Sequence, residues 1–200
     1  IRRSQSCVPA CLEAFSMSNL QGAYSWAVTR CNMANQAYDQ SYRNMQVRPS
    51  DQCTCFDCSS FTFFALWLGG GFDMGSLGYS TNLSDYTSIP NTANAWTVYW
   101  AEEYLPRLGW TRYNIGDVTP QAGDIVTKTE EHCEMVYAAS PLTLMGARSS
   151  QLPLADQVSI HQVSDLSWYD HIYRYGGTPP QPGGLPIWLL KRAIEIQKGG

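Results

Sequence analysis

The chain has 200 residues, of which 44% are hydrophobic and 12% aromatic, and its formal net charge is −4 at neutral pH. This composition is typical of a folded domain, because it offers enough apolar surface to build a core. The acidic balance, without a run of like charge, does not favour nucleic acid as a partner. No apolar stretch is long enough to cross a bilayer, so no membrane segment is expected.

The first part of the chain predicts helices. Residues 1–19 form an N-terminal extension, in which Cys7–Phe15 is a candidate short helix. A second helix begins at a cap formed by Ser18 or Asn19 and ends before Tyr38, because apolar residues recur at helical spacing after the cap. These apolar residues are Leu20, Tyr24, Ala27, Cys31 and Ala34.

The middle of the chain alternates polar loops with apolar helices. Residues 38–56 and 72–91 are rich in polar residues and predict loops. Ser59–Leu68 is apolar on nearly every side, which predicts a buried helix, and three glycines starting at Gly69 end it. Thr92 is a candidate cap for another helix. The apolar residues of that helix are Trp96, Tyr99, Trp100 and Leu105.

The last part of the chain predicts strands, followed by a linker. Alternating polar and apolar residues mark short strands at 125–128, 132–138, 142–148, 158–163 and 167–175. Helices followed by antiparallel strands predict an α+β domain over residues 20–176, with the helices packed on a small antiparallel sheet. Residues 177–200 predict a Pro/Gly linker and a C-terminal helix. Because the chain starts without Met and stops at Gly200, we expect it to be covalently joined to further domains of a longer parent protein.

Seven cysteines are present, and an odd number leaves at least one thiol unpaired if the others form disulfides. This cysteine content favours an extracellular destination, where disulfides persist. A disulfide from Cys53 or Cys55 to Cys31, or to the Cys7/Cys11 pair, is one way to pin the N-terminal segment. The remaining cysteines are Cys58 and Cys133.

Cys58 is the strongest candidate for a reactive group. It lies where the loop 38–56 gives way to the buried helix, and the unpaired amides and dipole at a helix start favour a negative charge. The thiolate is the nucleophilic form of cysteine. An arbitrary cysteine is more often an inert core residue, and the position of Cys58 at a helix start makes that interpretation weaker.

His132 is the candidate base, because a thiol nucleophile needs an imidazole within hydrogen-bond reach. His132 opens a predicted strand, and Glu134 lies on the same face of that strand two residues later. Glu134 can therefore orient the imidazole or line a cleft. We interpret His161 and His171 as structural or surface residues, and a site role is the alternative for His161.

Several segments together resemble a family of known enzymes. The segment 57–61, Asp-Cys-Ser-Ser-Phe before an apolar helix, is similar to the nucleophile motif of NlpC-type and CHAP-like peptidoglycan peptidases, especially those of phage lysins and tail-associated lysins. The resemblance spans residues 20–176, and it rests on the order of the motifs more than on any one of them. The other matching segments are 37–44, 122–126 followed by His132, 146–148 and 154–160.

The resemblance implies a papain-like core that hydrolyses an amide bond in cell-wall stem or cross-bridge peptides, with no metal or organic cofactor. It implies that Cys58 is the nucleophile and His132 the general base. Tyr38 matches the family's tyrosine near the cleft. Asp57 and Ser59, which flank Cys58 at the helix start, are further candidates for substrate binding. Bacterial peptidoglycan is then the expected partner, and the expected location is extracellular, at the cell wall or in a phage virion.

The third catalytic residue does not follow from the resemblance. The family's orienting group corresponds to Arg148, and a guanidinium cannot accept the imidazole proton. Either Glu134 orients His132, or a backbone carbonyl does so, or the site is a dyad; we favour Glu134.

Three alternatives stay open. Within the enzyme class, an N-acetylmuramoyl-L-alanine amidase would use the same residues as the favoured endopeptidase. A zinc module would draw ligands from Cys53, Cys55 and Cys58 with His132 or Cys133, although the chain lacks a paired Cys-x-x-Cys knuckle. A non-catalytic wall-binding module would use some of the aromatic residues, seven Trp and twelve Tyr, to stack on sugars.

Overall fold

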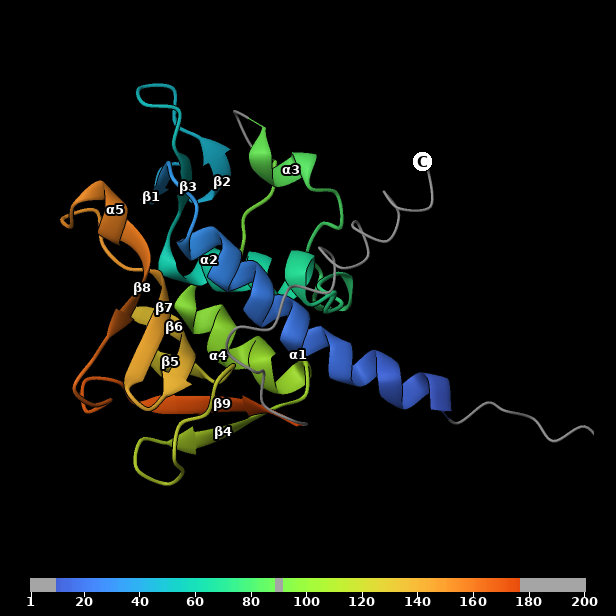
Figure 1. Cartoon of the computed structure of the whole chain (residues 1–200). Coiled ribbons are helices and arrows are strands. Elements are labelled where there is room, and N and C mark those ends of the chain that lie inside the picture. Colours follow the sequence, from blue (N-terminus) through green and yellow to red (C-terminus); the bar gives the residue numbers. More distant parts are fainter. Residues whose placement is uncertain (1–9, 89–91, 177–200) are drawn as a thin grey trace, which may run out of the picture.

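A computed structural model describes residues 10–88 and 92–176, with side chains from Asn19 onward. The structure is a mixed α+β arrangement of helices against antiparallel strands, as the order of elements predicts. Its main sheet has six strands in the order β4-β9-β5-β6-β7-β8, and a smaller sheet has the order β1-β3-β2. Figure 1 shows the longer helices gathered on one side of the main sheet.

The main sheet is antiparallel throughout, and its strands are short. Strand β6 lies near its centre, between β5 and β7, and Ile125 of β5 pairs with Met135 of β6. A register irregularity interrupts the pairing of β6 with β7 between Val136 and Ala138. The strand bounds are β4 Trp110–Asn114, β5 Ile125–Lys128, β6 His132–Ala139, β7 Leu142–Ala147, β8 Val158–Gln162 and β9 His171–Tyr175.

The helix α2, Cys58–Phe64, lies in the middle of the fold, and all seven of its residues are buried. It continues as a π-helical turn, Ala65–Gly69, and it packs against β6 and β7 on one side. Trp96 fixes its first turn by donating from Nε1 to the carbonyl of Ser59 at 2.9 Å. A helix buried on every side must keep its polar groups satisfied internally, which restricts its first turn to a few arrangements.

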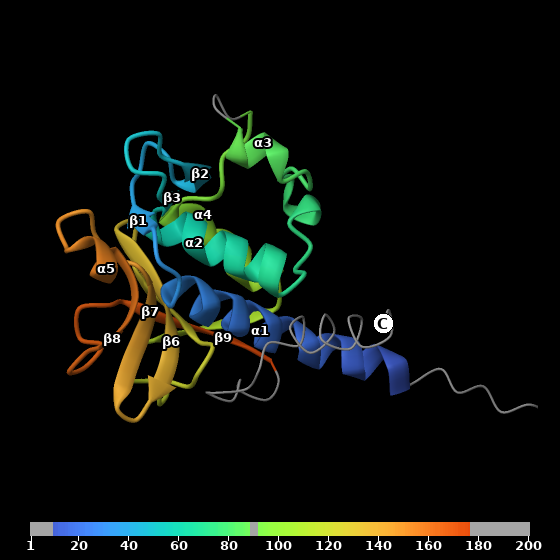
Figure 2. The same cartoon turned by 45° about the horizontal axis from the view of Figure 1, so that its top comes forward.

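Two longer helices complete the layer. Helix α1, Ala10–Cys31, lies beside α2 and the π-helical turn (Figure 2), and α4, Val98–Arg107, packs against α2 and against β4 of the main sheet. Glycines allow α1 to approach the π-helical turn closely, because a Cβ added to Gly22 would lie 2.3 Å from the carbonyl oxygen of Gly69. Shorter helical pieces are the 3₁₀ turn Gly75–Leu77, α3 Ser84–Thr87 and α5 Leu154–Gln157.

The structure corrects several sequence predictions. The segment 38–56 is not a plain loop, because it holds most of a small sheet whose strands are β1 Gln36–Tyr38, β2 Asn44–Val47 and β3 Thr54–Phe56. The sequence predicts two helices before Tyr38, whereas the structure has one, α1, over Ala10–Cys31. Thr97, not Thr92, caps α4, and its Oγ1 accepts from the amide of Trp100. Strand β4 was not predicted at all, because it is mostly exposed and shows no apolar face.

The remaining predictions divide into two groups. Strands β5 to β8 fall within one residue of their predicted bounds, and the glycines after Leu68 do end the central helix. The linker and C-terminal helix predicted for residues 177–200 lie outside the described residues, as do residues 1–9. None of the helices within residues 10–88 and 92–176 has the length and apolar character needed to cross a membrane.

Replacing Gly22 by Ala tests the close approach of α1 to the π-helical turn. The added methyl group meets backbone atoms, so we expect a loss of about 1–3 kcal/mol in the free energy of unfolding, measured by urea denaturation. Gly176→Ala is the matched control, because its Cβ would meet nothing within 4 Å, and its effect should stay within about 0.5 kcal/mol. Equal stability of the two variants would show that the helices do not approach each other this closely.

Candidate active site

Cys58 is the first residue of α2, and the residues around it form a tight cap. The carboxylate of Asp57 accepts from the amide of Ser60 at 2.8 Å, and the hydroxyl of Ser60 accepts from the amide of Asp57 at 3.0 Å. This reciprocal capping box satisfies two backbone donors that would otherwise be buried without a partner. The cap therefore holds the start of the helix, and with it the Cys58 side chain, in one position.

Arg43 ties this cap to the rest of the fold. Its Nε lies 2.9 Å from Oδ2 of Asp57, and its Nη2 donates to the hydroxyl of Ser59 at 3.0 Å and to the carbonyl of Trp96. Asp57 and Ser59 are buried and neither lines the pocket described below, so the structure places both in the support of the helix start. A direct substrate contact by these two residues stays a prediction.

His132 and Cys133, at the start of β6, both reach the Cys58 thiol. Hydrogen bonds from the Cys133 thiol and from the His132 imidazole outweigh the effect of burial and lower the pKa of Cys58 from 9.0 to about 5. The pKa of Cys133 moves the other way, well above 9.0, because it donates to Cys58 and is fully buried. Cys58 is the thiol of this pair that ionises, since it alone has the imidazole beside it.

The His132 imidazole is held in its charged form. Burial lowers its pKa, but hydrogen bonds with Cys58 and Glu134 outweigh burial and raise the pKa from 6.5 to about 10. Nε2 of His132 lies 3.5 Å from Oε2 of Glu134. The charges therefore alternate along the site, from the thiolate of Cys58 through the imidazolium of His132 to the carboxylate of Glu134. Glu134 occupies the orienting position that the sequence favours.

Glu134 is almost fully buried, at 2% exposure, and its carboxylate has three neighbours at Oε2. The hydroxyl of Tyr169 donates to it at 2.5 Å, and Nε2 of His161 lies 3.7 Å away. Burial raises the pKa of Glu134, but hydrogen bonding with His132 and Tyr169 and the nearby imidazoles lower it overall. Gly146 on β7 makes room for this side chain, because a Cβ there would lie 3.1 Å from Cγ of Glu134.

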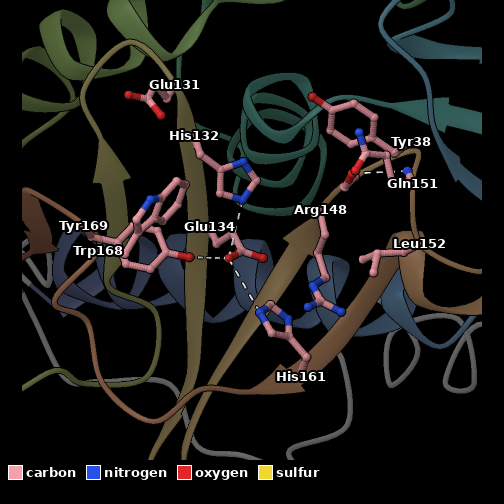
Figure 3. Close-up of a pocket in the computed structure, with 11 residues that line it drawn as sticks. Tyr38, Glu131, His132, Glu134, Arg148, Gln151, Leu152, His161, Trp168 and Tyr169 are labelled. Carbon is pink, nitrogen blue, oxygen red and sulfur yellow. Dashed lines mark hydrogen bonds and ion pairs between the residues drawn. The ribbon is translucent and has the colours of Figure 1, made fainter.

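A pocket of about 540 Å³ opens beside His132 and Glu134, which both line it, whereas Cys58 is buried and does not line it. Figure 3 shows His132 above Glu134, with Tyr169 and His161 converging on the carboxylate from two sides. Sequence reasoning kept a site role for His161 only as an alternative and missed Tyr169, since nothing local links either residue to β6. The other lining residues are Tyr38, Glu131, Arg148, Ser149, Gln151, Leu152 and Trp168.

Tyr38 lies at the pocket, as the resemblance implies. It ends strand β1, and its amide donates to Oε1 of Gln157 at 3.0 Å, which fixes the strand end. Burial and the nearby Cys58 thiolate raise the pKa of Tyr38 to about 12, so it remains a neutral phenol. A neutral hydroxyl beside the thiolate can donate a hydrogen bond to a ligand in the pocket.

The remaining cysteines and histidines do not join this site. Cys53 and Cys55 pack with Ala37 in a separate cluster under the small sheet, and His171 pairs with Glu102 at 3.2 Å. Within the ranges that the structure describes, no three potential metal ligands gather at one point. The five cysteines with described side chains are free thiols, so the proposed disulfide between Cys31 and the Cys53/Cys55 pair is absent; Cys7 and the Cys11 side chain lie outside the described part.

Comparison with protein-family models, with curated proteins and with solved structures finds no match to this chain.

Replacing Glu134 by Gln tests the charged pair at its buried end. Loss of the carboxylate should lower the pKa of His132 from about 10 by about one unit or more, measured by NMR titration of the imidazole. The folded-state pKa of His132 lies above 6.5, so this pair stabilises the fold fully below pH 6.5 and the contribution is lost as the pH rises through about 10. Because Glu134 must also be ionised, and its pKa lies below 4.5, the variant should be destabilised most between pH 4.5 and 6.5.

Glu102→Gln is the matched control for this titration. It removes a carboxylate that also pairs with an imidazole, that of His171, in the same sheet. It should leave the His132 titration unchanged. A His132 pKa near 6.5 in the unmodified protein, or equal pKa values in both variants, would refute the charged pair.

Proposed function

We propose that this chain is a cysteine hydrolase with a papain-like core, which cuts an amide bond in the peptide part of the bacterial cell wall. The observation that carries the proposal is the line from the Cys58 thiolate through His132 to Glu134 at the edge of an open pocket. A capped helix start, an imidazole on a neighbouring strand and a buried orienting carboxylate are the parts that thiol-based amide hydrolysis requires.

The proposed reaction has two stages. The Cys58 sulfur attacks the carbonyl carbon of the scissile amide, and backbone amides at the start of α2 stabilise the oxyanion that forms. His132 gives its proton to the leaving nitrogen, so the C–N bond breaks, an amine departs and a thioester remains. Neutral His132 then takes a proton from water as the water oxygen attacks the thioester carbonyl. The C–S bond breaks, the carboxylic acid is released, and the Cys58 thiolate with protonated His132 is restored.

Glu134 acts on His132 and does not need to touch the substrate. Its carboxylate stabilises the imidazolium before attack, and it keeps Nε2 of the ring occupied at 3.5 Å so that the other nitrogen is left for the sulfur. Tyr169 holds the same carboxylate oxygen and so fixes the direction of this interaction. This arrangement supports a triad rather than a dyad.

The substrate class rests on the resemblance, supported by where the matching segments lie. The segments around Tyr38 and His132 are far apart in sequence, in β1 and β6, yet both line one pocket. Cys58, at the start of α2, does not line it but lies close enough to Tyr38 and His132 to raise the pKa of both. An open pocket lined by polar and aromatic side chains suits a peptide better than a small buried metabolite. Within this substrate class, an endopeptidase is the first choice and an N-acetylmuramoyl-L-alanine amidase the second. The same proposal includes an extracellular location, at the wall or in a phage virion, within a longer parent protein.

Loss of wall lysis in Cys58→Ala is the direct test. The rate of turbidity loss of purified peptidoglycan should fall at least about a thousandfold, because no other group replaces the nucleophile. Cys53→Ala is the control, since it removes a buried thiol under the small sheet and should keep the activity of the unmodified protein. Mass spectrometry of the released muropeptides then identifies the new amino and carboxyl ends, and so the bond that is cut.

Two outcomes would contradict the proposal. Equal lysis by the unmodified protein and Cys58→Ala would reject Cys58 as the nucleophile. Equal binding to the wall by both proteins, with lysis by neither, would favour a non-catalytic binding module.

A further inference from the structure

Arg148 follows β7 directly and lines the pocket that holds His132 and Glu134. Its backbone is fixed, because its amide donates to the carbonyl of Gln157 at 2.7 Å. Figure 3 shows its side chain extending into the same space as Glu134 and His161. Arg148 therefore lies beside His132 and Glu134. From the sequence we concluded only that its guanidinium cannot orient the imidazole of His132.

Within the residues that the structure describes, the guanidinium of Arg148 forms no ion pair and no hydrogen bond. Most of the other arginines there do form an ion pair. Four other arginines each pair with a carboxylate: Arg43 with Asp57, Arg48 with Asp39 and Asp51, Arg107 with Glu103, and Arg174 with Asp124. The arginine side chain is always charged and offers donors in a flat fork that matches a carboxylate. Arg148 presents that fork to the pocket instead of to its own chain.

Other polar atoms near Arg148 also lack partners. Oε1 of Glu134 and Nδ1 of His161 are buried and form no hydrogen bond, and both residues line the pocket. The positive charges of Arg148 and His132 help to lower the pKa of His161, although burial is the larger cause. His161 is thus a neutral imidazole, and Arg148 is the cation available to a ligand on this side of His132.

The pocket also has opposite charges on its two sides. Glu131 lies on the far side of His132 from Arg148 (Figure 3). A ligand that spans the site therefore meets a carboxylate at one end and a guanidinium at the other. A peptide chain with a carboxylate near the cleaved bond fits the Arg148 end, and its reverse orientation would bring that carboxylate against Glu131.

We propose that Arg148 binds a carboxylate of the substrate peptide and so selects acidic over amidated peptides. This inference rests on the proposed function for the identity of the peptide, but carboxylate binding does not require cleavage. Two carboxylates of a stem peptide share this chemistry, the free carboxyl of its glutamate residue and its C-terminus. Arg148 is a binding residue in this account and takes no part in proton transfer.

The test uses three synthetic stem peptides that differ only in these groups. In one peptide both carboxyls are amidated, in the second the glutamate carboxyl is free, and in the third the C-terminus is free. Affinity is measured by calorimetry with the Cys58→Ala protein, in which turnover cannot remove the ligand. We expect one acidic peptide to bind at least about tenfold more tightly than the doubly amidated one, as a hydrogen-bonded charge pair provides.

Arg148→Gln in the same background should abolish that preference, and Arg148→Lys should retain part of it. Arg107→Gln is the matched control, because it removes an equal charge from the exposed end of α4. Circular dichroism of each variant confirms that the fold is retained. The acidic peptide that gains affinity identifies which carboxylate is bound.

Equal affinity for all three peptides, no measurable binding of any of them, or a preference that survives Arg148→Gln would overturn the inference. These results are distinct from a failure of the proposed function. An acidic preference that depends on Arg148, with no hydrolysis by the protein that retains Cys58, would keep the binding role and reject the hydrolase. Hydrolysis that depends on Cys58, without a preference for acidic peptides, would keep the hydrolase and reject the binding role of Arg148.

Discussion

The buried carboxylate of Glu134 is the charge on which the candidate site depends. A carboxylate at 2% exposure is costly unless charged or polar groups surround it, and His132, His161 and Tyr169 supply them. The same carboxylate keeps His132 protonated, and the imidazolium in turn favours the thiolate of Cys58. Removing Glu134, His132 or Cys58 leaves a buried charge without its partner, so these three charged groups stabilise one another.

The fold places these groups by two separate means. Strand β6 sets His132 and Glu134 on one face, since alternate residues of a strand point the same way. The cap of α2 sets Cys58, because Arg43, Asp57 and Ser60 satisfy each other around the helix start. Aromatic contacts then join α2 to α1 and to Trp96, while α2 also packs directly against β6 and β7.

The local parts of this arrangement were readable from the sequence. The apolar run after Cys58 predicted a buried helix, and alternation predicted the strand of His132 and Glu134, because both patterns depend only on neighbouring residues. The small sheet, most of which falls within residues 38–56, was missed because its strands are only three or four residues long and too short to show an alternating pattern. Two partners of Glu134 were not assigned to the site, because His161 and Tyr169 come from distant segments and no periodicity encodes a contact across the sheet.

The ionisation of Cys58 is the central claim, and the pH dependence of thiolate ultraviolet absorbance measures it most directly. The difference between the unmodified protein and Cys58→Ala isolates this thiol and needs no reagent to reach it. Because hydrogen bonds from Cys133 and His132 lower its pKa from 9.0, the difference should appear with a midpoint near pH 5 and persist through neutral pH. A midpoint at or above pH 9.0 would mean that Cys58 is an ordinary buried thiol, and it would contradict the account.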